Sequence, residues 1–143
     1  MQDCFRPLFL PVEITAREID AKQNICAIAV KHGFTVYIGS KTSVAHLAVK
    51  VGFGVYLGKD HGPQSFGQYE NLVMAGIDIY CMDEEGFIFH SQKEYSKRVD
   101  PRIIAMSKGI FLWGENQRRT LDTILDHNYE NFFLTGNPRF DVL

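Results

Sequence analysis

The sequence predicts an α/β fold, a Rossmann-like doubly wound parallel sheet of about six strands with flanking helices. Apolar runs of strand length alternate with helical stripes along the whole chain. Four of the predicted helices end in a glycine directly before a strand. Residues 77–82, IDIYCM, are almost continuously apolar, as in a strand buried on both faces of a parallel sheet. These observations indicate βα units joined by right-handed crossovers.

Six apolar segments are predicted to form the strands. They cover residues 7–12, 34–38, 53–57, 77–82, 110–113 and 132–135. Each ends in polar or glycine-rich sequence, as expected where a strand is followed by a helix. We expect all of them to lie parallel in one sheet.

The first two helices have recognisable start signals. Thr15 and Glu18 fit the S/T-x-x-E capping box, so the first helix should begin near Thr15 and end at Gly33. The second helix should be capped by Thr42 or Ser43, directly after the second strand.

The later helices have less complete start and end signals. A third helix is expected over residues 65–75, and Asp100 and Pro101 fit the N-cap and first position of a helix that runs to Gly109. A last helix precedes the sixth strand. Residues 87–99 interrupt the alternation of strands and helices, and they fit either a short strand with a surface helix or a long loop.

Composition and charge limit the classes of function. The chain has 143 residues, 45% hydrophobic and 22% charged, so we interpret residues 1–143 as a single Rossmann-like domain. Its formal net charge of −2 gives no general attraction to nucleic acid or anionic membranes. The longest apolar stretches fall far short of the roughly 20 residues of a membrane span, and no signal pattern is present. We therefore expect no transmembrane segment and a cytoplasmic protein.

The cysteines and histidines do not predict a metal or disulfide framework. Cys4, Cys26 and Cys81 are odd in number and far apart, so we interpret them as buried free thiols of a reducing compartment. The five histidines show no HExxH or His/Cys spacing. No metal site is expected.

Acidic side chains follow the first and fourth predicted strands, at the edge where open α/β sheets bind ligands. Glu13 follows the first strand, and Asp83, Glu84 and Glu85 follow the fourth. Neighbouring carboxylates raise the pKa of one of them, which would provide an acid or base for removing a proton from a sugar hydroxyl. In extended backbone Asp83 and Glu85 would point one way and Glu84 the other. These four are the catalytic candidates.

Structural interpretations of the same acidic residues stay open. The cluster after the fourth strand also fits solvated loop charges or the N-cap of the next segment. Glu13 also fits an ion pair with Arg17 that steadies the strand-to-helix turn.

Other polar residues at the carboxyl ends of the strands are candidates for substrate binding. They are Arg17, Ser40, Lys41, His61, Asn137 and Arg139. Residues 39–42, GSKT, could hold an anion at a helix start but lack the spacing of a P-loop. Gly52-x-Gly54 precedes a strand, which excludes the dinucleotide fingerprint, so no NAD or FAD is expected. No G-x-S-x-G elbow supports a hydrolase.

Five motifs occur in order over nearly the whole chain. They are LPVEITAREIDAK at 10–22, YIGSK at 37–41, DEEG at 83–86, WG at 113–114 and TGNPRFD at 135–141. Together they resemble the N-terminal half of bacterial surface carbohydrate biosynthesis proteins. LPVE-x-x-x-RE-x-D-A-K combined with DEEG is the most specific part, because TG-x-P turns also occur in sugar-nucleotide epimerases and other glycosyltransferases.

That family is similar to GT-B glycosyltransferases and CDP-glycerol glycerophosphotransferases, in which two Rossmann-like domains face each other across a cleft. The resemblance implies that this chain is the acceptor-side domain of a sugar-nucleotide-dependent glycosyltransferase in surface or capsular polysaccharide biosynthesis. It implies that Glu13 and residues 83–85 face the cleft, and that residues 137–139 begin the passage to a second domain. No cofactor would be tightly bound. A nucleotide sugar would be the donor and a carbohydrate the acceptor, with a C-terminal nucleotide-binding domain in cis or in trans, so the chain alone would be an incomplete enzyme.

Two other interpretations stay open. An enzyme half similar to a sugar-nucleotide epimerase or a glycerophosphotransferase would differ in the donor that it consumes. A non-catalytic, flavodoxin-like binding or regulatory module would tolerate replacement of Glu13, Glu84 or Glu85 by Ala.

Overall fold

The computed structural model describes residues 5–86, 88–125 and 129–142. The strands are β1 (Pro7–Val12), β2 (Thr35–Ser40), β3 (Gly54–Gly58), β4 (Ile77–Met82), β5 (Gly109–Leu112) and β6 (Phe132–Leu134). The helices are α1 (Thr15–Lys31), α2 (Lys41–Val51), α3 (Phe66–Met74), α4 (Gln92–Ser96), α5 (Pro101–Met106) and α6 (Glu115–Ile124). Two 3₁₀ turns are η1 (Pro63–Ser65) and η2 (Pro138–Val142).

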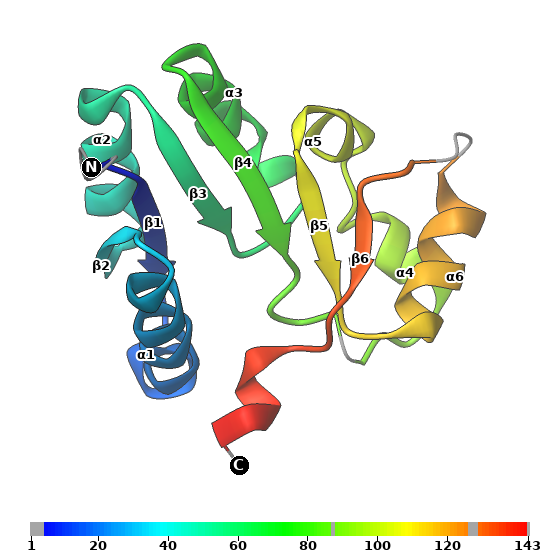
Figure 1. The fold of residues 1–143 in the computed structure, drawn as a ribbon. Coiled ribbons are helices and arrows are strands. Elements are labelled where there is room, and N and C mark those ends of the chain that lie inside the picture. The colour runs from blue at the N-terminus through cyan, green and yellow to red at the C-terminus, as the bar shows by residue number, and fades with distance from the viewer. Residues whose placement is uncertain (1–4, 87, 126–128, 143) are drawn as a thin grey trace.

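The six strands form one parallel sheet in the order β2-β1-β3-β4-β5-β6 (Figure 1). This confirms the predicted Rossmann-like α/β fold. The chain runs outward from β1 to β2 and then crosses back to β3 on the other side of β1, so the strand order reverses between β1 and β3. Ligands of open α/β sheets bind outside the carboxyl ends of the strands at such a reversal.

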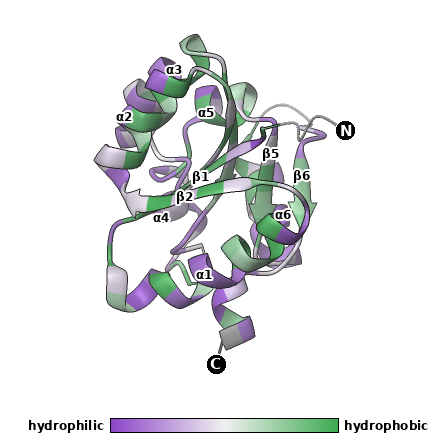
Figure 2. Ribbon diagram, turned by 60° about the vertical axis from the view of Figure 1, so that its left-hand side comes forward, coloured by the Kyte–Doolittle hydropathy of each residue, from purple (hydrophilic) through white to green (hydrophobic). Residues whose placement is uncertain are grey.

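Most helices cover one face of the sheet. α2, α3, α4, α5 and α6 pack there around a core that includes Tyr56, Ile79 and Leu112. On the other face α1 packs over the sheet through Ile25 and Ala29, and η2 lies against α1. Figure 2 shows the hydrophobic strands between helices that carry hydrophilic outer faces. The turn η2, which borders the site described below, lies on this second face.

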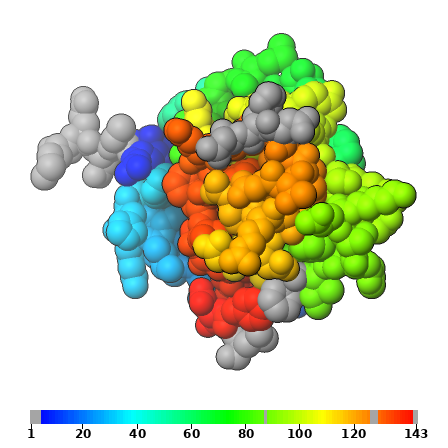
Figure 3. Space-filling model, turned by 90° about the vertical axis from the view of Figure 1, so that its right-hand side faces the viewer, coloured from blue at the N-terminus to red at the C-terminus, as the bar shows by residue number. Residues whose placement is uncertain are grey.

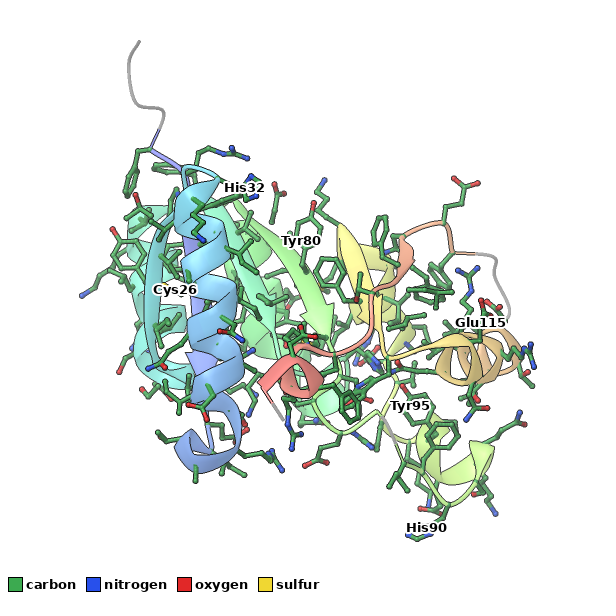
Figure 4. The ribbon with its side chains drawn as sticks, turned by 60° about the horizontal axis from the view of Figure 1, so that its bottom comes forward. Cys26, His32, Tyr80, His90, Tyr95 and Glu115 are labelled. Atoms are coloured by element: carbon green, nitrogen blue, oxygen red, sulfur yellow. The ribbon has the colours of Figure 1, made fainter. Side chains whose placement is uncertain are left out.

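The second face is open over β4, β5 and β6. Tyr80 and Phe111 stack on it with ring centroids 5.8 Å apart, and both are only partly buried. Tyr80 lies on the strand between α1 and β5 (Figure 4), and β6 reaches the surface beside α6 (Figure 3). Asp78 of β4 is exposed on this face, and Phe133 of β6 is 46% exposed. The prediction that residues 77–82 are buried on both faces is therefore wrong.

Three of the four predicted glycine ends are confirmed. Gly33, Gly52 and Gly76 follow α1, α2 and α3 with φ of 81°, 77° and 92°, the left-handed region that favours glycine. The fourth is wrong, because α5 ends at Met106 and Gly109 is the first residue of β5.

The start of α1 differs from the predicted capping box. Its N-cap is Ile14 rather than Thr15, and no side chain caps it. Only the glutamate half of the motif forms, since the Glu18 carboxylate accepts the backbone N–H groups of Glu13 at 3.0 Å and Ile14 at 3.3 Å.

The start of α2 also differs, by two or three residues. Ser40, rather than Thr42 or Ser43, is the N-cap, and its hydroxyl accepts the backbone N–H of Ser43. At α5 the prediction is confirmed, since Asp100 is the N-cap and Pro101 the first helical residue.

The segment that the sequence left ambiguous contains a short helix. From residue 88 onward it is a loop that carries α4, and Tyr95 of α4 is buried; Phe87 lies outside the described residues. None of the helices in the described part of the chain is long and apolar enough to cross a lipid bilayer.

The cysteines fit the free-thiol interpretation in part. Cys81 is a buried free thiol and Cys26 a half-buried one, whereas Cys4 lies outside the described residues. Burial raises the pKa of the Cys81 thiol to about 12.

Candidate functional site

The carboxyl ends of the strands bring together charged residues from distant parts of the chain. Glu13 follows β1, Lys59 follows β3 and Asp83 follows β4. These strands are neighbours in the sheet, so the three residues meet at one edge. Figure 4 looks toward this edge, with α1, η2 and α4 around it.

Lys59 lies between two glutamates at the reversal of strand order. Its Nζ is 2.7 Å from Oε2 of Glu13 and 2.7 Å from Oε1 of Glu18. Lys59 and Glu18 are buried, whereas the side chain of Glu13 is 60% exposed. The hydrogen bond and charge of Lys59 lower the pKa of Glu13. Burial opposes ionisation of Glu18, but hydrogen bonds from Lys59 and the backbone outweigh it and lower its pKa as well.

Glu84 forms a buried ion pair. Its Oε1 lies 3.0 Å from Nζ of Lys22, and the two side chains are 6% and 1% exposed. The backbone carbonyl of Glu84 accepts a hydrogen bond from the Arg139 guanidinium at 3.2 Å. A carboxylate that is buried and already paired fits a structural role better than proton transfer to a substrate.

Asp83 is also buried and bonded on several sides. Its carboxylate accepts hydrogen bonds from the Arg98 guanidinium at 2.7 Å, the Tyr95 hydroxyl at 3.2 Å and the backbone N–H of Glu85 at 3.0 Å. The indole N–H of Trp113 donates to the backbone carbonyl of Asp83. Asp83 thereby holds the loop after β4 against the segment around α4 and the loop after β5.

Glu85 differs because its side chain is 60% exposed. It lies 3.3 Å from Nη1 of Arg17 and 3.7 Å from Nη2 of Arg98. Arg17 thus pairs with Glu85 and Glu18 rather than with Glu13, so the alternative pairing considered for Glu13 does not form.

The three consecutive acidic residues contact cations of α1 and of the segment after α4. Arg98 contacts both Asp83 and Glu85, whereas Glu84 binds Lys22 of α1. Glu85 also contacts Arg17 of α1, and residues 84–86 form a turn in which the Gly86 N–H donates to the Asp83 carbonyl, so the alternation predicted for extended backbone does not apply. The next helix, α4, takes its N-cap from its own segment, so none of the three serves as that cap.

A cavity of about 380 Å³ opens beside Glu85. Its lining, which combines two arginines, two glutamates and three apolar side chains, consists of Arg17, Arg139, Glu84, Glu85, Ile88, Trp113 and Phe140. The rings of Trp113 and Phe140 pack edge to face with centroids 5.5 Å apart. We call this space the carboxyl-edge cavity; its volume lies in the range of small-ligand pockets.

A larger cavity, of about 500 Å³, lies on the open face of the sheet. Its lining is mainly apolar and includes Phe53, Val55, Tyr80 and Phe111. Its charged residues are Arg6 and Asp78. It lies toward the amino ends of the strands, away from the edge where α/β folds bind ligands. The carboxyl-edge cavity is therefore the candidate functional site.

Two of the predicted substrate-binding residues, Arg17 and Arg139, line the carboxyl-edge cavity. Asn137 is buried and its Oδ1 accepts the backbone N–H of Arg139 at 3.0 Å, so it shapes the turn that carries this arginine. His61 is 1% exposed, and its Nδ1 lies 3.2 Å from the backbone carbonyl of Arg98. In this position His61 is closed to a ligand.

The remaining predicted binding residues lie elsewhere on the edge. Ser40 caps α2. Lys41 lies 3.6 Å from Asp60 and donates to the Ser65 hydroxyl at 3.2 Å. Neither Ser40 nor Lys41 lines the carboxyl-edge cavity, so the structure separates them from Arg17 and Arg139.

Several residues of the site were missed by sequence reasoning. Lys22 and Glu18 were assigned to the helix and its capping box, although both stand in the LPVE-x-x-x-RE-x-D-A-K motif that carries the resemblance. Arg98 and Tyr95 lie in the segment whose structure was left ambiguous, and Phe140 lies in the TGNPRFD motif. The motifs were thus the signal that could have found three of these five residues.

The described ranges contain no group of His, Cys, Asp and Glu side chains arranged to hold a metal ion. Comparison with known protein families, curated proteins and solved structures finds no match to this chain.

Proposed function

We propose that this chain is the acceptor-side domain of a sugar-nucleotide-dependent glycosyltransferase that acts in the cytoplasm in surface or capsular polysaccharide biosynthesis. The observation that carries the proposal is that Trp113 and Glu85 line one cavity at the carboxyl edge of the sheet. An indole ring offers an apolar surface to the C–H face of a sugar, and an exposed carboxylate can accept a hydroxyl proton. The sequence resemblance supports the same class.

Glu85 is the best candidate for the general base among the four acidic residues. Glu84 also lines the cavity, but it is buried against Lys22. Glu13 and Asp83 stand outside the lining, and Asp83 is buried as well. Glu85 alone of the four combines an exposed side chain with a place in the cavity wall.

In the proposed reaction an acceptor hydroxyl oxygen attacks the anomeric carbon of the donor. Glu85 takes the hydroxyl proton as the new C–O bond forms. The bond between the anomeric carbon and the phosphate oxygen breaks, and its electron pair leaves with the nucleoside diphosphate. The groups that hold this diphosphate belong to a nucleotide-binding domain in cis or in trans.

The test begins with the coding DNA beyond the Leu143 codon and the intact mass of the natural protein, which define what must be assayed. That protein is then incubated with nucleotide sugars, with and without polysaccharide acceptor, and nucleoside diphosphate release is measured. We expect acceptor-dependent release that falls about 100-fold or more in Glu85→Gln. Glu94→Gln, an exposed change on α4, is the matched control and should keep full activity.

Other outcomes would replace the proposal. Acceptor-independent conversion of the nucleotide sugar would indicate an epimerase-like enzyme, and consumption of CDP-glycerol a glycerophosphotransferase. Absence of any turnover, with sugar binding unchanged in Glu85→Gln, would indicate a non-catalytic binding module.

A further inference from the structure

Among the described residues that line the carboxyl-edge cavity, Arg139 is the cation that forms no ion pair. Its Nη1 donates to the backbone carbonyl of Glu84 at 3.2 Å, and among the described residues no carboxylate lies within 4.0 Å of its guanidinium. By contrast, Arg17, Lys22 and Arg98 each lie within that distance of a carboxylate. Most of the hydrogen-bonding capacity of the Arg139 fork is therefore available to a ligand.

The two carboxylates of the cavity wall are already balanced. Glu84 is paired with Lys22, and Glu85 with Arg17. Arg139, by contrast, has no carboxylate of the described residues within 4.0 Å of its guanidinium. An anionic group placed in the cavity would meet the charge of this guanidinium in a partly enclosed site, where attraction is stronger than in bulk water.

The backbone presents Arg139 in a defined position. Asn137, which is 5% exposed, accepts the backbone N–H of Arg139, and η2 packs against α1. Next in the chain, Phe140 places its ring against Trp113. The cation and the aromatic wall are thus held by one short turn, which lowers the cost of ordering them on binding.

We propose that the carboxyl-edge cavity selects a carbohydrate that carries a carboxylate or a phosphate, with its ring against Trp113 and its anion on Arg139. This inference rests on the proposed function, because it specifies the acceptor of the same site. The planar guanidinium matches the two oxygens of a carboxylate or phosphate, and a lysine would not reproduce that fork.

The test uses the fluorescence of Trp113, which is the single tryptophan of the chain. The protein is titrated with glucuronate, glucose 6-phosphate and glucose at low salt while the emission is recorded. We expect saturable changes with at least one of the anionic sugars, at an affinity about tenfold or more above that for glucose. The two anionic sugars distinguish carboxylate from phosphate as the recognised group.

Arg139→Gln should lower the affinity for the anionic sugar to that for glucose and leave the affinity for glucose itself unchanged. Arg119→Gln is the matched control, since Arg119 is exposed on α6 and stands outside the cavity lining. Arg139→Lys keeps the charge without the fork and should give an intermediate affinity, which provides a second variant should the glutamine variant fold poorly.

Equal affinities for glucose and the anionic sugars, or no effect of Arg139→Gln, would overturn the selection of an anion and leave a carbohydrate site in place. Binding of inorganic phosphate without any contribution from the sugar ring would overturn both this inference and the proposed function. No change in Trp113 emission with any of the sugars would overturn the inference, whereas the transfer assay would still decide the proposed function.

Discussion

Lys22 and Glu84 form an ion pair in which Nζ and Oε1 lie 3.0 Å apart and neither side chain is more than 6% exposed. The pair joins α1 to the loop after β4, and the backbone of Glu84 receives Arg139 from η2. Buried charges are costly unless they are paired. This contact therefore connects three elements at the wall of the carboxyl-edge cavity.

Lys22→Met should be strongly destabilising, because it leaves the charge of Glu84 buried without a partner. We expect the free energy of unfolding at pH 7 to fall by about 3–5 kcal/mol, measured by urea denaturation. Adding Glu84→Gln should recover part of the loss. Lys97→Met is the control, since Lys97 and Glu94 form an exposed pair, 63% and 54% accessible, whose loss should cost less than about 1 kcal/mol. Equal losses in the two single variants would contradict the argument.

Asp83 should be required for stability rather than for chemistry. Asp83→Asn removes the charge that Arg98 contacts and weakens the acceptor for Tyr95, so the free energy of unfolding should fall by about 2–3 kcal/mol. In the transfer assay, at a temperature where the variant is folded, turnover should stay within about tenfold of wild type, against about 100-fold or more lost in Glu85→Gln. A larger loss for Asp83→Asn than for Glu85→Gln would reverse the two roles.

The positions of the strands were predictable because each buried strand requires a local run of apolar residues. The segments 7–12 and 77–82 were placed with the same bounds as β1 and β4. The positive φ at Gly33, Gly52 and Gly76 was predictable for a similar reason. A residue in the left-handed region at the end of a helix favours glycine whatever packs around it.

The partners of the acidic residues were not predictable, because they depend on which strands become neighbours. Glu13 and Lys59 are 46 residues apart in the chain and meet only through the pairing of β1 with β3. The open face over β4 was missed for the same reason. An apolar run such as IDIYCM is compatible with one covered face or two, and Asp78 was the single sign of exposure within it.

Gly76→Ala should destabilise the fold severely, because two penalties act at one position. The backbone φ is 92°, and an added Cβ would lie 2.6 Å from the backbone carbonyl oxygen of Gly52. We expect the free energy of unfolding to fall by about 3 kcal/mol or more. Gly33→Ala is the matched control, with φ of 81° and nothing within 4 Å of the added Cβ, so only the backbone penalty of about 1–2 kcal/mol should appear. Similar losses of unfolding free energy in the two variants, measured by urea denaturation, would contradict the close approach of the turn after α3 to the turn after α2.

The pairing of Lys59 with two glutamates predicts an acid-dependent loss of stability. The pKa values of Glu13 and Glu18 are lowered from the ordinary value of 4.5 in the folded protein. The unfolded chain therefore binds more protons in acid. Stability from these residues is fully present above about pH 4.5 and is lost as the pH falls through their lowered values.

Lys59→Met should weaken this dependence. Glu18 is buried, and without Lys59 its carboxylate keeps only the backbone N–H groups of Glu13 and Ile14 and the more distant Arg17 as partners, so its pKa should rise toward the unfolded value. The variant should be less stable than wild type at pH 7, and the difference should shrink as the pH falls below about 4.5, because protonation removes the buried charge that has lost Lys59. Urea denaturation of both proteins between pH 3 and 8 measures this difference, and other titrating groups cancel in it. Lys97→Met should run parallel to wild type, and a parallel curve for Lys59→Met would show that Lys59 does not control the ionisation of Glu18.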